Sequence, residues 1–299
     1  MIEDFTKLLE PSFLASTSNI EIGSKLILEG FMLGKHKSRF HGFSAEFNDR
    51  REYIPGDNIR DLDWKAYGKT GKYFTKLYED ETNIHSYLFM DISKSMNYKA
   101  RSNITKLIYS QYLCAALARI LIFQNDSVAL GLYGHDIVDY LPPKAGRQNL
   151  NNILKMISSL KLSESRVTTE SYDKISGLLK KNGIVYFVTD FLENPDEIIE
   201  KILLVKRSGN DVIIFLIHDE EEKEFDFKRG SRIVDSETGN EIDLNSDKLS
   251  SLYREEYRKH YHEIIAKLTE YEILSIMVST DTAFHIPLTE MSLKNGNIR

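Results

Sequence analysis

Three polar residues at alternate positions directly follow a short apolar run, and their side chains could bind a metal ion. The run is Tyr87–Met90, and Asp91, Ser93 and Ser95 come after it. If the run is a buried strand and the loop behind it stays extended, alternate side chains point to the same side. One carboxylate and two hydroxyls would then converge. Oxygen ligands with a low summed charge suit Mg²⁺, or alternatively Mn²⁺, in an octahedral shell.

Two later segments could supply further oxygen ligands. Thr168 and Thr169 precede one predicted helix, and Asp190 follows another apolar run and precedes a helix that begins near Pro195. Asp and Ser are also preferred helix caps, so each loop taken alone could be only a cap. In a parallel sheet, however, ligands gather at the carboxyl ends of the strands. The coincidence of three such loops therefore favours a metal site.

The elements that must position these residues begin near residue 85, where short apolar runs alternate with longer amphipathic segments. This alternation is typical of βαβ units and a parallel sheet. Buried strands are predicted at Tyr87–Met90, Val128–Leu132, Ile184–Val188, Val212–Ile217 and Ile273–Val278. Helices are predicted at 104–123, 150–160, 172–181, 195–205 and 246–271. Residues 136–141 follow the second strand so closely that a hairpin is expected, which would add one antiparallel edge strand. We predict an α/β domain over residues 85–299, with a polar insertion near 219–245.

Residues 1–84 form a different, smaller N-terminal region in this interpretation. Helices are expected near 2–10 and 21–33, and an edge strand at 73–79. Residues 50–65 contain four acids, four Arg or Lys residues and the only tryptophan. Such a density of opposite charges can lock a turn through arginine–carboxylate pairs. A metal or hydrolytic site with Asp57, Asp61 and Asp63 is the alternative, but the segment has no histidine and its acids already have cationic partners.

Composition limits the classes of function. The formal net charge of −6 argues against a nucleic-acid partner, which would require a concentrated cationic face. A single cysteine, Cys114, excludes a disulfide within the chain and fits a reducing compartment. The N-terminus lacks the pattern of a secretory signal. Arg119 interrupts one apolar stretch and Val212–Ile217 is short, so no direct membrane span is expected. We predict a cytoplasmic protein.

The Asp-x-Ser-x-Ser motif at Asp91, Ser93 and Ser95, with a later threonine and Asp190, resembles the metal-ion-dependent adhesion site of von Willebrand factor A-like domains. The resemblance implies a Rossmann-like fold with helices on both faces of the sheet. It also implies that these residues bind Mg²⁺ and that the ion takes an Asp or Glu from a partner protein. Thr169 is the preferred threonine because Ile175 then falls at the apolar helix position that usually follows. Thr168 is the alternative, and no glycine precedes the threonine as in the family pattern.

A second resemblance involves the charged segment. Arg51, Tyr53, Gly56, Asp57, Arg60, Asp63 and Trp64 are similar to the signature of the domain of unknown function 58 family, which lies shortly before an A-like domain. The similarity continues through residues 74–81, the metal loop and the turn at 235–239, and so covers nearly the whole chain. It implies a non-enzymatic adaptor for a MoxR-type AAA+ ATPase that assembles or matures client proteins.

An enzyme is the competing hypothesis. A haloacid-dehalogenase-like phosphohydrolase would use Asp91 as its nucleophile. Such enzymes normally place a second aspartate two residues later as the general acid, whereas this chain has Ser93. Serine cannot donate a proton with a matched pKa near neutrality. The sequence therefore favours a binding module over a phosphohydrolase.

Two other motifs give no site. His260 and His262 lie two residues apart on a predicted helix, where their side chains point about 200° apart, so a shared metal is not expected. Both histidines are expected at the surface. No Walker lysine motif occurs, and ATP hydrolysis by this chain is not expected.

Overall fold

The computed structural model describes residues 9–17, 19–37, 50–53, 62, 64–76, 84–98, 104–163, 166–192, 195–224, 232–234, 241–243 and 247–295. The chain forms two compact units. The larger unit combines residues 1–38 with residues 84–299, and the smaller unit comprises residues 39–83.

The larger unit is built on a six-stranded sheet with the order β10-β7-β6-β3-β4-β5. Five neighbouring strands are parallel, and β5 runs antiparallel to β4 at one edge. The strands are β3 (His85–Asp91), β4 (Ser127–Tyr133), β5 (Ile137–Lys144), β6 (Ile184–Thr189), β7 (Asp211–His218) and β10 (Leu274–Ser279). The predicted α/β class, the mainly parallel sheet and the antiparallel hairpin strand are confirmed. The arrangement is compatible with a Rossmann-like fold of the von Willebrand factor A type.

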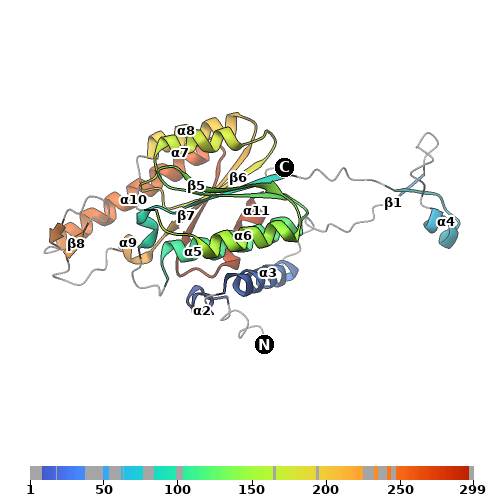
Figure 1. The fold of residues 1–299 in the computed structure, drawn as a ribbon, viewed down its shortest axis with the longest axis horizontal. Coiled ribbons are helices and arrows are strands. Elements are labelled where there is room, and N and C mark those ends of the chain that lie inside the picture. The colour runs from blue at the N-terminus through green and yellow to red at the C-terminus, as the bar shows by residue number, and fades with distance from the viewer. Residues whose placement is uncertain are drawn as a thin grey trace. The chain divides into compact units, whose positions relative to one another are not determined.

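Helices cover both faces of this sheet (Figure 1). One face carries α7 (Thr169–Leu178), α8 (Pro195–Arg207) and α10 (Asp247–Glu270), and the other carries α5 (Lys106–Phe123), α6 (Arg147–Ser159) and α11 (His285–Asn295). The alternation of side chains along β3 explains the two layers. Leu88 and Met90 belong to the hydrophobic cluster under α5, whereas Tyr87 and Phe89 belong to the cluster under α7 and α8.

Helix α5 is the central helix of its face. Its N-cap is Thr105, whose hydroxyl oxygen accepts a hydrogen bond from the Ile108 amide at 3.1 Å. Among the described helices, α5 alone is long and apolar enough to cross a membrane. Of its 18 residues, 72% are buried inside the fold. The helix meets this criterion of length and composition although it contains Lys106 and Arg119, and the expectation that no segment spans a membrane stays a prediction. Its burial is that of a core helix.

The first helices of the chain pack on the outer side of α5. They are α2 (Pro11–Thr17) and α3 (Ile20–Lys37). The Tyr112 hydroxyl of α5 donates to the Leu14 carbonyl at 2.8 Å, and a Cβ at Gly23 would lie 2.3 Å from the Tyr112 ring. Because α3 must bury its own apolar side chains, including Ile27 and Phe31, it joins the α/β unit. The structure thus separates residues 9–37 from the region predicted as 1–84.

The smaller unit and the polar insertion are described in part. In the smaller unit, β1 (Arg50–Glu52) pairs antiparallel with β2 (Phe74–Lys76), next to helix α4 (Trp64–Thr70). The predicted charge lock through Asp57, Arg60 and Asp63 lies outside the described residues, as do nearly all of the helix predicted at 2–10 and the turn at 235–239. The insertion contains α9 (Glu220–Glu224) and a short hairpin of β8 (Arg232–Val234) and β9 (Glu241–Asp243).

The packing of β3 against β4 gives a test of the core. A Cβ at Gly131 would lie 2.5 Å from the buried Phe89 ring, so Gly131→Ala must displace that ring. We expect the free energy of unfolding in urea to fall by about 1–3 kcal/mol. Gly177→Ala in α7 is the control, because nothing lies within 4 Å of its Cβ. The control is expected to be neutral or to raise stability by about 0.5–1 kcal/mol. Equal destabilisation by both changes would contradict this packing.

Candidate functional site

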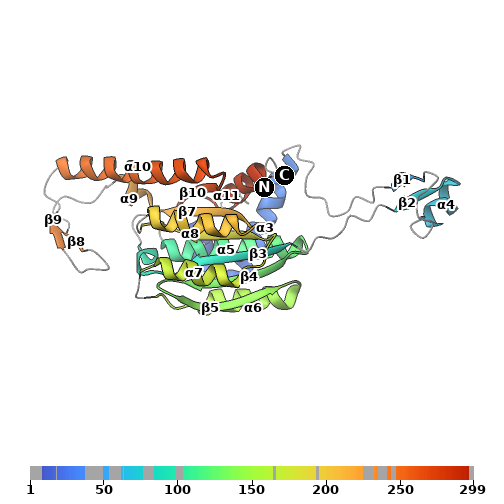
Figure 2. The ribbon, with the colours of Figure 1, turned by 90° about the horizontal axis from the view of Figure 1, so that it is seen from above.

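The predicted site residues lie at the carboxyl ends of two adjacent parallel strands. Asp91 is the last residue of β3, and Asp190 directly follows β6. These strands pair with each other, and β4 lies on the other side of β3. The chain therefore turns to one side after β3 and to the other side after β6, as the view along the sheet in Figure 2 helps to follow. This is the switch point at which loops diverge in an open α/β sheet.

The loop after β3 brings its three polar residues together through a tight turn. The Asp91 Oδ1 atom accepts a hydrogen bond from the Ser93 amide at 2.8 Å, which closes an Asx turn. The hydroxyls of Ser93 and Ser95 lie 3.0 Å apart. Residues Lys94–Asn97 form a 3₁₀ helix instead of the extended loop that the spacing suggested. The convergence of the hydroxyls thus arises from a turn and not from strand alternation.

Asp91 is fully buried, and both of its carboxylate oxygens accept hydrogen bonds. Oδ2 accepts from the Thr189 hydroxyl at 2.8 Å, which ties the end of β3 to the end of β6. Burial and then the negative charge of Asp190 raise the pKa of Asp91 to about 7, against the hydrogen bonds from Ser93 and Thr189, which lower it. Loss of contact with solvent therefore disfavours the charged form of this carboxylate more than its two hydrogen bonds favour it.

Asp190 is also fully buried, and only one of its oxygens is paired. Oδ2 accepts from the Lys106 ammonium at 2.9 Å, whereas Oδ1 has no hydrogen-bond partner among the described residues. The backbone is held from α10, because the Tyr261 hydroxyl donates to the Asp190 carbonyl at 2.8 Å. The next residue, Phe191, has a left-handed φ of 56°. Such a conformation costs energy in a residue other than glycine and often marks functional loops.

Lys106 was not recognised from the sequence as a site residue. It is the first residue of α5, and its side chain is fully buried. Its ammonium lies 2.9 Å from Asp190 and 2.9 Å from Glu222, and 5.7 Å from the centre of the Tyr98 ring. Burial disfavours the ammonium, but the charges and hydrogen bonds of Asp190 and Glu222 outweigh it and raise the pKa of Lys106. The sequence carried one signal for Lys106. A lysine in the first turn of a helix is unfavourable because its charge opposes the helix dipole, so its presence there suggests a specific acidic partner.

Glu222 comes from α9, which follows β7. The side chain of Asp219 accepts from the Glu221 amide at 2.9 Å, and Glu222 Oε2 in turn accepts from the Asp219 amide at 3.3 Å. This reciprocal arrangement is a capping box and holds Glu222 toward the sheet. Burial raises the pKa of Glu222, and the ammonium of Lys106 opposes that shift. Glu222, the third residue of α9, is the acid of this helix that pairs with the buried Lys106.

The predicted threonine ligand is the residue that the structure does not join to the others. The Thr168 hydroxyl donates to the His135 carbonyl at 3.1 Å, so it is engaged elsewhere. Thr169 is the first residue of α7 and is half-buried. Among the described residues, no hydrogen bond connects Thr169 with Asp91, Ser93 or Asp190. Hydrogen bonds join Asp91 to Ser93 and Ser93 to Ser95, and the charge of Asp190 acts on Asp91; these four residues are called the cluster below.

One of the two histidines set aside in the sequence supports the loop after β6. His260 Nε2 lies 3.0 Å from the Phe191 carbonyl, and the side chain is half-buried. Its expected surface position was therefore wrong, because α10 packs one side along this loop. His262 is exposed, as expected from its place two residues further along the helix.

A family model described as "Protein of unknown function DUF58" matches residues 49–265. The chain belongs to this family. The matched range includes Asp91, Ser93, Ser95, Asp190 and Lys106, so the buried cluster lies within the DUF58 region. The family assignment predicted from the charged segment is confirmed.

Relatives of this DUF58 chain include uncharacterized proteins Rv1480 of Mycobacterium tuberculosis and Mb1516 of Mycobacterium bovis. Each is 23% identical over 190 residues, which cover 61% of this chain and 58% of the relative. The chain thus spans little more than half the length of these relatives.

Solved structures with a similar course of the chain include the conserved hypothetical protein BatB from Bacteroides thetaiotaomicron. It has a TM-score of 0.46 and 15% identity, and the match covers 70% of this chain and 99% of that one. An aerotolerance-related membrane protein from Bacteroides fragilis has a TM-score of 0.47 and 15% identity, and covers 71% and 98%.

The chemistry of the cluster fits a divalent cation held mostly by oxygen atoms of low charge. No group of three or more His, Cys, Asp or Glu side chains suited to a metal occurs in the part of the chain that the structure describes. The available donors are instead the hydroxyls of Ser93 and Ser95 and the carboxylates of Asp91 and Asp190. The Lys106 ammonium pairs with both Asp190 and Glu222, so these two buried carboxylates share one positive charge. A divalent cation beside Asp190 would add positive charge at this end of the sheet.

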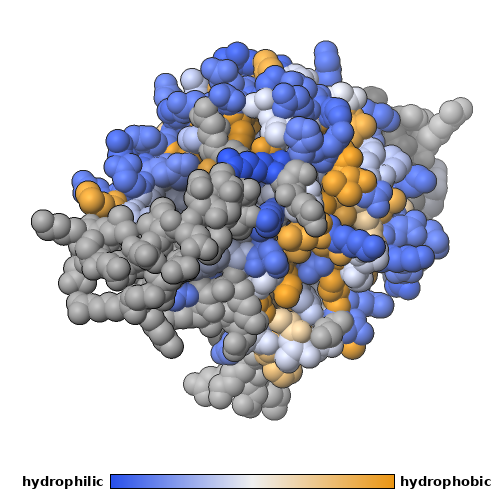
Figure 3. Space-filling view, turned by 60° about the vertical axis from the view of Figure 1, so that its left-hand side comes forward, coloured by the Kyte–Doolittle hydropathy of each residue, from blue (hydrophilic) through white to orange (hydrophobic). Residues whose placement is uncertain are grey.

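Ser95 is the most exposed residue of the cluster. It is half-buried, whereas Asp91, Ser93 and Asp190 are fully buried. Leu192, two residues after Asp190, is 45% exposed. Figure 3 turns the left-hand side of Figure 1 forward and shows hydrophobic and hydrophilic side chains mixed on it.

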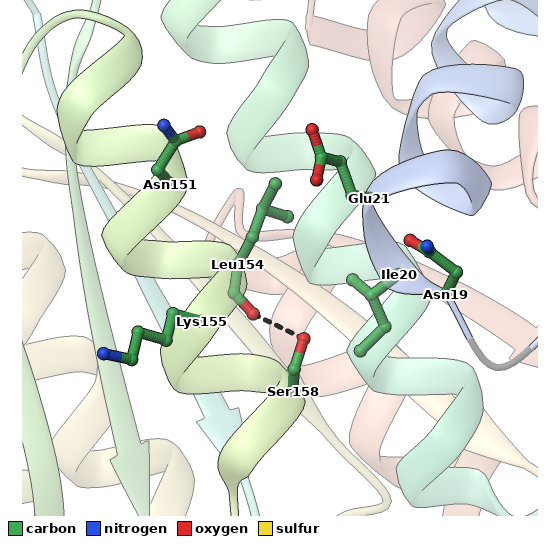
Figure 4. A pocket seen from close by; sticks show the side chains of 7 residues that line it. All are labelled: Asn19, Ile20, Glu21, Asn151, Leu154, Lys155 and Ser158. Atoms are coloured by element: carbon green, nitrogen blue, oxygen red, sulfur yellow. Dashed lines mark hydrogen bonds between the residues drawn. The ribbon is translucent and has the colours of Figure 1, made fainter.

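A separate cavity of about 440 Å³ lies between the start of α3 and α6 (Figure 4). Its lining residues are Asn19, Ile20, Glu21, Asn151, Leu154, Lys155 and Ser158. The Ser158 hydroxyl donates to the Leu154 carbonyl of its own helix at 2.7 Å. Because the charged side chains of this cavity are exposed and none of the predicted site residues line it, we do not assign it a ligand.

The hydrogen bond between Thr189 and Asp91 gives a test of the site geometry. Thr189→Val keeps the shape of the side chain but leaves Asp91 Oδ2 without its donor. We expect the free energy of unfolding in urea to fall by about 1–3 kcal/mol. Thr189→Ser keeps the hydroxyl and is expected to cost less than half as much. Equal losses in the two variants would contradict this assignment, because Thr189→Ser keeps the hydroxyl that donates to Asp91 and Thr189→Val does not.

Proposed function

We propose that this DUF58 protein is a non-enzymatic, metal-dependent module that binds a carboxylate of another protein. The observation that carries the proposal is the buried cluster at the ends of β3 and β6. Two serine hydroxyls lie 3.0 Å apart in the loop of the buried Asp91, and the buried Asp190 has Lys106 on Oδ2 but no hydrogen-bond partner for Oδ1 among the described residues. A buried acceptor without a partner is costly unless an ion or water pairs with it.

Mg²⁺, or alternatively Mn²⁺, would be held by Asp91, Ser93, Ser95 and Asp190, with Thr169 as the proposed fifth residue. A bound divalent ion with few charged ligands would supply an electrophilic centre for an incoming Asp or Glu. Residues of this chain would position the ligands. Asp91 orders the serine loop by accepting from the Ser93 amide, and Tyr261 holds the backbone of Asp190.

The proposed partner is a MoxR-type AAA+ ATPase, for which this protein would act as an adaptor in the assembly or maturation of client proteins in the cytoplasm. The DUF58 membership supports this proposal, because the family resemblance implies such an association. The carboxylate-binding site would then be the point at which the ATPase or its client is attached.

The alternative of a phosphohydrolase with Asp91 as nucleophile has less support. Both oxygens of Asp91 already accept hydrogen bonds, from the Ser93 amide and from the Thr189 hydroxyl. The position of the general acid is taken by Ser93, whose hydroxyl contacts Ser95. Such a phosphohydrolase needs a general acid beside its nucleophile, and a serine hydroxyl cannot donate a proton with a matched pKa near neutrality.

The first test is metal binding by isothermal titration calorimetry. We expect the wild type to bind Mg²⁺ or Mn²⁺ at one site, and Asp91→Ala combined with Ser93→Ala to lose binding at least about tenfold, since a carboxylate and a hydroxyl ligand are removed. Asp136→Ala is the control, because Asp136 forms an exposed ion pair with Lys174. Equal affinity of the wild type and the double variant would remove the basis of the proposal.

The second test is metal-dependent association. A purified MoxR-type ATPase from the same genome, immobilised on a biosensor surface, is expected to retain this protein in millimolar Mg²⁺. Addition of a chelator should abolish retention, because the partner carboxylate would lose its binding centre. The Asp91→Ala, Ser93→Ala variant should behave in Mg²⁺ as the wild type does in chelator. Retention that is the same with and without chelator would contradict a metal-mediated contact.

A further inference from the structure

The buried ammonium of Lys106 is a second cationic group at the proposed metal site. It is 2.9 Å from Asp190 Oδ2, and the remaining oxygen of that carboxylate, Oδ1, is the buried atom without a partner. Lys106 reaches this position from the first turn of α5, 84 residues before Asp190 in the chain. The side chain is fully buried, so solvent does not screen its charge as it would at the surface.

The two oxygens of one carboxylate would therefore serve two cations. A divalent ion at Oδ1 and an ammonium at Oδ2 repel each other across a few ångströms, and they also share the electron density of one acid. In a buried site, this repulsion is large compared with the same charges in water. Lys106 consequently has two effects. Its ion pair with Asp190 stabilises the folded protein, and its positive charge lowers the affinity of the site for a divalent ion.

In the part of the chain that the structure describes, the tyrosines near Lys106 add no positive charge. Tyr98, Tyr253 and Tyr257 surround the Lys106–Glu222 pair, and burial followed by the charge of Glu222 raises the pKa of each phenol. These side chains stay neutral. Glu222 is thus the second acid that pairs with the Lys106 ammonium, and its negative charge reduces the net positive charge near Asp190.

We propose that Lys106 is a tethered cation that competes with the divalent ion for Asp190 and lowers the metal affinity of the site, while Glu222 partly offsets this effect. The inference rests on the proposed function and specifies how that site is tuned. The affinity for metal then depends on whether Glu222 of α9 stays on the ammonium. Any movement of α9 that withdraws Glu222 weakens metal binding, and a partner that presses α9 onto the site strengthens it.

The test uses calorimetric titration of the whole protein with Mn²⁺ and compares three changes. Lys106→Met keeps the aliphatic stem and removes the ammonium, and we expect the dissociation constant to fall about tenfold or more. Glu222→Gln removes a negative charge, and we expect the dissociation constant to rise by a similar factor. The combination of both changes should lie within about threefold of the wild type. A structural role alone would weaken binding in all three variants.

Lys201→Met is the matched control, because Lys201 pairs with Asp173 on a different part of the surface. Circular dichroism and a cooperative thermal transition confirm that each variant is folded. If Lys106→Met does not fold, Glu222→Gln decides: weaker Mn²⁺ binding supports the proposal, and unchanged or tighter binding overturns it.

The outcomes separate this inference from the proposed function. Binding in the wild type that requires Asp91, together with unchanged or weaker binding in Lys106→Met, overturns the inference alone. Absence of Mn²⁺ binding in the wild type and in every variant overturns both. Binding that appears only after Lys106→Met supports the inference in its strongest form, since the ammonium would then exclude the metal.

Discussion

The compensation of buried charge at the ends of β3 and β6 is the constraint on which the rest of the site depends. Asp91 and Asp190 lie inside the protein, where an unpaired carboxylate is costly. Hydrogen bonds from the Ser93 amide and the Thr189 hydroxyl satisfy one carboxylate, and the Lys106 ammonium satisfies half of the other. Helix α5, the loop after β6 and helix α9 are each placed so that these contacts form.

The architecture explains why so few residues can build this site. Adjacent parallel strands end at the same level, and the chain leaves β3 and β6 toward opposite faces of the sheet, so their loops diverge around a gap. Helix α10 then closes one side of the loop after β6, where Tyr261 and His260 bind the carbonyls of Asp190 and Phe191. These contacts hold the left-handed backbone of Phe191, and they fix the direction of the Asp190 carboxylate.

The cluster differs from a site of three or more carboxylate, histidine or thiolate ligands in its low charge. Serine hydroxyls bring oxygen atoms without adding negative charge, so a cation held there would remain able to attract another acid. The buried ammonium of Lys106 lowers the net negative charge of the cluster further, because it pairs with Asp190. In the proposed function, such a site would serve reversible contact with a protein carboxylate, whereas hydrolysis has less support because Ser93 stands at the position where a general acid would be needed.

The sequence by itself determined the local elements. The alternation of apolar runs and helices placed all six strands of the sheet, and the hairpin after β4 was evident from the short separation. The same pattern placed Asp91 and Asp190 at the carboxyl ends of β3 and β6, whereas their role as metal ligands with Ser93 and Ser95 stays a proposal. Only the tertiary structure decided that α3 joins the α/β unit, that Ser95 converges on Ser93 through a 3₁₀ turn, and that Lys106 pairs with a glutamate 116 residues away. Contacts of that separation depend on strand order and helix packing, which no local pattern of residues specifies.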